Sequence, residues 1–132
     1  MVKTRSRRDD PAPGPDGLVL RGLLAGTVLE LAELRETAVL NHELYGFYGI
    51  SVWLAADDEE RSALETTKLV KFEQYAEFTV ASVTTSGLRL DPTGQRPHYG
   101  VVYGDSADEL AALLAQVPFQ VRVNPHVDRE EH

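Results

Sequence analysis

The residues best suited to chemistry in this chain are a guanidinium, two imidazoles, a phenol and a hydroxyl: Arg21, His42, His98, Tyr48 and Ser51. An imidazole exchanges protons near neutral pH, and a guanidinium stabilises negative charge. Such a set is what acid–base chemistry on a phosphodiester or a nucleotide would use. Each member lies on or beside an expected strand of one sheet, so a catalytic cluster is one hypothesis. His98 is its leading member, because it follows Pro97 at a strand entry, where a side chain can project from a sheet.

Structural roles compete with catalysis for two of these residues. Arg21 stands in the apolar run 18–24, so it must face solvent or pair with a carboxylate. His42 falls at the margin of an apolar helix face, where a partly buried imidazole with a hydrogen-bond partner is common. We weigh the structural role above the catalytic one for both side chains.

No motif raises the catalytic hypothesis to a specific activity. The chain contains no dinucleotide-binding, phosphate-loop, zinc-protease or nucleophile-elbow motif. It has no cysteine, and no two of its four histidines stand three or four residues apart. We therefore expect no metal site and no cofactor, and whether the chain is an enzyme stays open.

Charge and composition limit the partners. Residues 1–16 hold four basic and three acidic side chains, whereas the remainder holds nine basic and eighteen acidic ones. Duplex DNA requires a basic face, so we exclude it, while RNA or a nucleotide in a local basic cleft stays open. The apolar runs are far shorter than the roughly 20 residues that span a bilayer, and the absence of cysteine suits a reducing compartment. We expect a cytoplasmic protein without a membrane partner.

Hydrophobic periodicity and capping signals predict alternating strands and helices. Beta-branched residues favour a strand within 76–86, but a short helix ending at Gly87 stays possible. The central element is the strand over 50–55, entered through Gly46 and Gly49. The other expected elements are a strand over 17–24, a helix from a Thr27–Glu30 capping box to about Leu44, a helix over 61–70, a hairpin of 87–90 with 97–103, a helix from Ser106 to Val117 and an edge strand over 119–123.

These elements predict one α+β domain over residues 17–127, with a mixed sheet of about five strands packed with two or three helices. The basic, proline-rich segment 1–16 is expected to be a flexible tail, and 128–132 a charged tail. The turn over 91–94 implies an antiparallel hairpin. An α+β fold is therefore favoured over a doubly wound parallel one.

The first functional hypothesis is a protein-binding module, accessory or regulatory, without catalysis of its own. It rests on aromatic residues of the kind that are enriched at interfaces: Trp53, Tyr45, Tyr75 and Tyr99. These residues have the core of the domain as their alternative location. The second hypothesis is a small toxin-type enzyme acting on RNA or a nucleotide through His98, His42 and Arg21. The oligomeric state is not indicated by the sequence.

Overall fold

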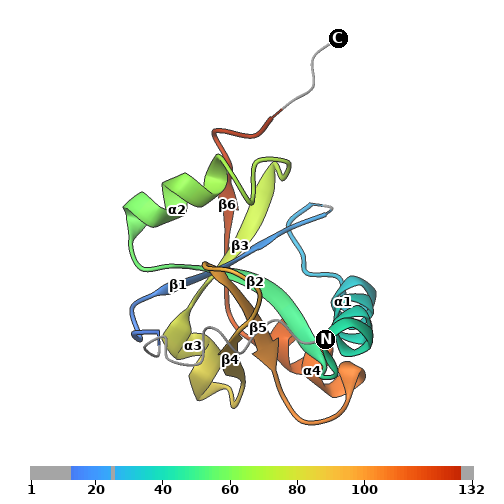
Figure 1. Cartoon of the computed structure of the whole chain (residues 1–132). Coiled ribbons are helices and arrows are strands. Elements are labelled where there is room, and N and C mark those ends of the chain that lie inside the picture. Colours follow the sequence, from blue (N-terminus) through green and yellow to red (C-terminus); the bar gives the residue numbers. More distant parts are fainter. Residues whose placement is uncertain (1–12, 25, 129–132) are drawn as a thin grey trace.

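A six-stranded sheet in the order β4-β5-β2-β1-β3-β6 forms the centre of the molecule (Figure 1). All of its neighbouring pairs are antiparallel. This computed structural model describes residues 13–24 and 26–128. The strands are β1 Leu18–Gly22, β2 Gly49–Ala55, β3 Gln74–Thr79, β4 Arg89–Pro92, β5 His98–Val102 and β6 Gln120–Val123.

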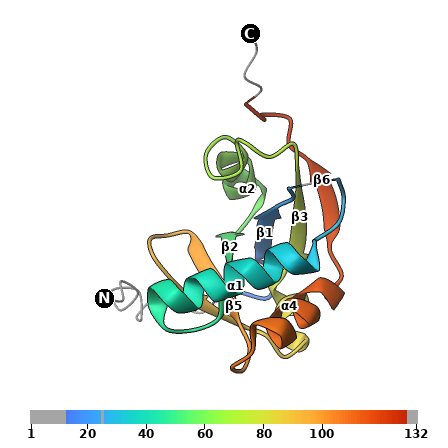
Figure 2. The ribbon, with the colours of Figure 1, turned by 90° about the vertical axis from the view of Figure 1, so that its right-hand side faces the viewer.

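Helices cover both faces of the sheet. The long helix α1 (Leu31–Tyr45) and α4 (Ala107–Gln116) pack side by side on one face, and α2 (Asp58–Glu65) lies on the other (Figures 1 and 2). The short helix α3 (Val80–Thr85) follows β3 directly. The molecule is therefore a single α+β domain, as the sequence predicts, with more helices and one more strand than expected. The expected mixed sheet is wrong, because every neighbouring pair of strands is antiparallel.

Two apolar clusters follow from the alternation of side chains along the strands. Val19, Ile50 and Val52 face α1 and α4 in the larger cluster. Leu20 and Ala55 face α2 in the smaller one. Because β2 lies in the middle of the sheet and contributes to both clusters, it is the central strand that the sequence predicts.

Local structure differs from the expectations at three places. Helix α1 begins after Glu30, which makes no side-chain cap bond, so the expected Thr27–Glu30 capping box is wrong. Gly26 adopts a φ of 64° in a turn over 26–28, Leu29 packs on the core, and Glu30 is still extended, so the helix starts only at Leu31. Helix α2 spans Asp58–Glu65, not the expected 61–70. It starts earlier because the Asp57 carboxylate caps it by accepting from the Glu60 amide, and residues 66–71 form turns instead of continuing the helix.

The third difference is that the ambiguous segment 76–86 contains both proposed structures. The strand β3 ends at Thr79, whose hydroxyl caps α3 by accepting from the Ser82 amide. Gly87, with a φ of 92°, then leads the chain out of the helix. The hairpin of β4 with β5 and the Ser106 cap of α4 are confirmed.

The two expected tails lie largely outside the described residues. Of the proposed 1–16 tail the structure describes only 13–16, and of 128–132 only Asp128. Pro15 is held against α3, because its carbonyl accepts a hydrogen bond from the Ala81 amide at 3.2 Å. No helix within the described ranges has the length and apolar character needed to cross a membrane.

Candidate functional site

Arg21 is a buried bridge between the sheet and α1. The β1–β2 ladder runs only as far as the pair Leu20–Trp53. Beyond it, Arg21 Nη1 donates to the Ser51 carbonyl oxygen at 2.5 Å, and Nη2 donates to the Glu33 carboxylate on α1. The guanidinium therefore closes the gap between two separating strands and neutralises an acid. This arrangement matches the structural alternative considered for Arg21.

His42 and Tyr48 form a stacked pair at the end of α1. Their ring centroids are 4.2 Å apart and their planes differ by 17°. Beside them, Asn41 Nδ2 donates to the Gly49 carbonyl oxygen at 2.6 Å and reaches Ser51 Oγ at 3.3 Å. Gly46 ends α1 with a φ of 88°, which folds the aromatic segment back onto the helix.

His98 lies elsewhere, at the first position of β5. Its ring meets the edge of Trp53 at a centroid distance of 5.8 Å. Its Nδ1 lies 2.6 Å from Thr93 Oγ1, so the imidazole fastens the turn between β4 and β5. Trp53 packs on the apolar cluster beneath α2, which places His98 on that face of the sheet.

The structure therefore separates the two imidazoles. The β2–β5 register pairs His98 with Trp53 at one end and Gly49 with Val102 at the other, four residues along. At roughly 3.3 Å per residue, the ends lie about 13 Å apart. His42 stacks on Tyr48, which packs on the α1 face, so the two histidines occupy opposite ends and opposite faces. Arg21, Ser51, Tyr48 and His42 gather around α1, whereas His98 does not join them.

The four aromatic interface candidates also divide. Tyr75 is fully buried, and Tyr99 is nearly so. Trp53 and Tyr45 are half-buried, and Tyr45 contacts Phe47 at a centroid distance of 6.3 Å. These side chains do not form one exposed patch, but Tyr99 reaches the wall of a large cleft.

This cleft has a volume of about 730 Å³. It lies at the C-terminal end of β2, between α2 and the turn that joins β4 to β5. Its lining is mainly apolar, with prolines, alanines and leucines from distant parts of the chain. The lining residues are Pro13, Gly14, Pro15, Asp16, Gly17, Leu54, Ala55, Ala56, Glu60, Ala63, Leu64, Thr67, Arg96, Pro97 and Tyr99. Its volume is within the range of about 300–1,000 Å³ that is typical of ligand-binding pockets.

Two acidic side chains line the cleft. Asp16 and Glu60 line it, and the exposed run Asp57-Asp58-Glu59 continues from Glu60 around the start of α2. Arg96 is the one basic residue of the lining. The lining holds no histidine, serine or cysteine, and its polar groups are those of Asp16, Glu60, Thr67, Arg96 and Tyr99. It therefore offers a mainly apolar surface with two carboxylates.

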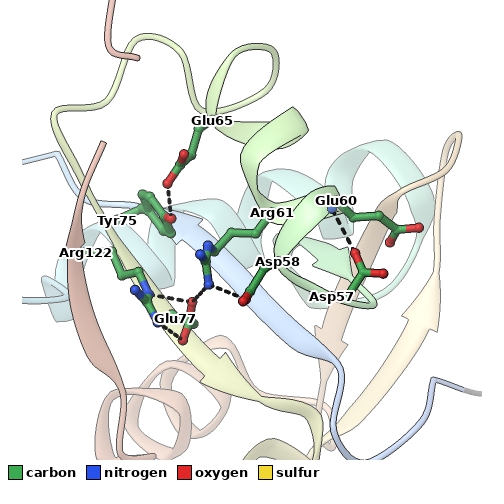
Figure 3. A network of polar contacts seen from close by, with 8 residues as sticks. All are labelled: Asp57, Asp58, Glu60, Arg61, Glu65, Tyr75, Glu77 and Arg122. Carbon is green, nitrogen blue, oxygen red and sulfur yellow. Dashed lines mark hydrogen bonds and ion pairs between the residues drawn. The ribbon is translucent and has the colours of Figure 1, made fainter. Parts of the chain in front are cut away.

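A polar network fixes the helix that forms one wall of this cleft (Figure 3). Arg61 of α2 does not line the cleft. Its Nη1 lies 2.8 Å from the Asp58 carboxylate and 3.5 Å from the carboxylate of Glu77 on β3. Arg122 on β6 binds both oxygens of Glu77, at 2.7 and 3.2 Å. Glu77 is thus shared by two guanidinium groups, and it ties α2 to two strands.

The buried pair Tyr75–Glu65 belongs to the same wall (Figure 3). The Tyr75 hydroxyl donates to the Glu65 carboxylate at 2.5 Å. Burial and, after it, this hydrogen bond raise the pKa of Tyr75 well above its usual value. Asn124 Nδ2 donates to the Glu65 and Leu69 carbonyl oxygens at 3.1 and 3.0 Å, which anchors the chain after β6 to the end of α2.

The sequence gives little warning of the cleft. Its walls come from 13–17, 54–67 and 96–99, segments with no shared motif. The one feature of the sequence that indicates a cleft is a set of small residues at the end of β2 and on one face of α2, because small side chains leave space. These residues are Ala55, Ala56 and Ala63.

Comparison of the chain with protein-family models, with curated proteins and with solved structures finds no match. Within the described ranges, no three histidine or acidic side chains are grouped so that they could hold a metal ion.

Proposed function

We propose that this protein is a binding module whose cleft beside α2 takes an apolar side chain of a partner protein, flanked there by basic residues. The observation that carries the proposal is the large apolar cleft with an acidic rim. Burying an anchor side chain in such a cleft removes apolar surface from water and supplies most of the binding free energy.

Charge complementarity specifies the partner's flanks. Asp16 and Glu60 line the cleft, and the exposed acids 57–59 precede Glu60 in the chain, so lysine or arginine beside the anchor would be attracted and acidic residues repelled. Glu60 also serves the fold, because its carboxylate accepts from the Ala56 amide at 2.7 Å. Asp57 likewise caps α2, and Asp58 is paired with Arg61. The exposed Glu59 is therefore the more available contact on α2.

The toxin-type enzyme on RNA or a nucleotide has less support. It would require His42 and His98 to act on one substrate, and they occupy opposite faces of the sheet. Arg21, its proposed charge stabiliser, is engaged with Ser51 and Glu33.

The test is selection from a random peptide library displayed on phage, followed by affinity measurement with a fluorescent form of an enriched peptide. Enriched sequences should combine Leu, Phe or Trp with neighbouring Lys or Arg. Ala63→Arg places a long cation in the cleft and should weaken binding at least tenfold. Ser62→Arg is the matched control, because it makes the same charge change on α2 outside the cleft lining. Equal binding by both variants, or enrichment of acidic peptides, would overturn the proposal.

A further inference from the structure

The strand β6 is an open edge of the sheet with its apolar residues uncovered. Val121 is 36% exposed and Val123 is 68% exposed. Both lie on the face that α1 and α4 cover, because Val121 pairs with Ala76 of the larger apolar cluster. Figure 2 shows β6 at the margin of the helical layer. The helices therefore leave this last strip of the sheet in contact with water.

The backbone of the same residues lacks a strand partner. In an antiparallel ladder, alternate residues direct both N–H and C=O to the same neighbour. The Asn124 amide donates to the Glu73 carbonyl oxygen on the β3 side, so Arg122 and Gln120 point the same way. Val121 and Val123 therefore point away from β3, and no described strand lies on that side.

The opposite edge of the sheet is better protected. Pro92 in β4 has no N–H to offer, and the apolar Leu90 is 9% exposed. Arg89 and Asp91 are paired along that edge at 2.8 Å. Only β6 combines exposed valines with outward-pointing backbone groups within the described ranges.

We propose that β6 pairs with β6 of a second copy of this chain, antiparallel about a two-fold axis, with Val121 opposite Val121 of the second copy. This register places Val123 opposite Phe119 of the second copy, so apolar side chains meet along one face. Phe119 lies on that face already, because its ring packs on Phe78 at 5.3 Å. The exposed apolar strip of each copy is covered by the other.

The charges select this register over its neighbour. Here Arg122 lies opposite Gln120 of the second copy, on the face that carries the Glu77 ion pair. Centring the pair on Arg122 would instead set two guanidinium groups directly opposite each other, which is unfavourable. Pro118 and Pro125 flank the strand and have no N–H to donate, so the pairing is limited to this short segment. Because the two-fold axis uses the same edge of both copies, the assembly stops at a dimer.

Sedimentation velocity of the full chain from about 10 µM to about 1 mM tests the proposal, because a short strand pair should associate weakly. A concentration-dependent dimer is expected. Val121→Pro removes the outward N–H of each copy, two hydrogen bonds in all, and should weaken the dimer at least tenfold. Val121→Thr, which keeps the N–H, is the matched control and should stay within about threefold.

Amide hydrogen exchange of the unmodified chain gives an independent readout if Val121→Pro fails to fold. The amides of Val121 and Val123 should exchange more slowly at high concentration than at low, while that of exposed Tyr103 stays unchanged. A monomer over the whole range, equal dimers for the two variants, or exchange at Val121 that ignores concentration would each overturn the proposal. The proposal would also be overturned if the chain stays monomeric and its β6 edge pairs only with a strand of another protein.

Discussion

Tyr75→Phe removes one hydroxyl from the wall that supports the cleft. Tyr75 has no exposed surface, and its hydroxyl donates to Glu65, which is 6% exposed. The variant keeps the ring but leaves a buried carboxylate without this donor. A hydrogen bond to a charged group contributes about 1.5–3 kcal/mol, so we expect a loss of about 2 kcal/mol in the free energy of unfolding. For a chain of this size that lowers the melting temperature by roughly 7 °C.

Urea unfolding followed by circular dichroism measures the loss, and Tyr103→Phe at an exposed site is the control. A double-mutant cycle isolates the interaction. Glu65→Met removes the acid, so Tyr75→Phe should cost less in that background, with a coupling of about 1–2 kcal/mol. If the two changes are additive, or if Tyr75→Phe costs no more than Tyr103→Phe, the pair does not hold the wall as argued.

The other predictions concern pH, the buried guanidinium and a helix end. Above about pH 10 the unfolded chain releases the Tyr75 proton that the folded chain retains, because burial and the bond to Glu65 raise the pKa of Tyr75. Stability should thus fall with rising pH, less steeply in Tyr75→Phe; equal slopes in urea-unfolding series would contradict this. Arg21→Met should lower the free energy of unfolding by about 2 kcal/mol in the same assay, since the Ser51 carbonyl oxygen and the Glu33 carboxylate lose their donor. Gly46→Ala should cost about 1 kcal/mol, because Gly46 has a φ of 88°. An unchanged urea midpoint in either variant would refute its reasoning.

Local signals in the sequence predicted the elements whose cause is local. The Ser106 cap of α4 depends on contacts within one turn, and the hairpin of β4 with β5 on one short turn. The Thr27 signal failed because Leu29 packs on the core and draws the chain away from a helical path. Tertiary packing therefore overrode a capping pattern that was correct in composition.

The candidate site was harder to predict for the same reason. Arg21 was recognised as a residue needing a partner, but its bonds to Ser51 and Glu33 join three separate elements. Side-chain types suggested that His42 and His98 belong together, whereas strand register decides their separation. The cleft arises from the absence of large side chains on converging segments, which leaves no motif in the chain.

The most direct test of the proposed function is a nuclear magnetic resonance titration of the full chain with an enriched peptide. We predict chemical-shift changes that saturate at Leu54, Ala63 and Thr67, with an intermolecular nuclear Overhauser contact from the peptide's apolar side chain to Ala63. Val121 on β6 should not shift, which separates this site from the proposed dimer edge. Changes confined to β6, or to His42 and Tyr48 at the end of α1, would contradict the cleft as the binding site.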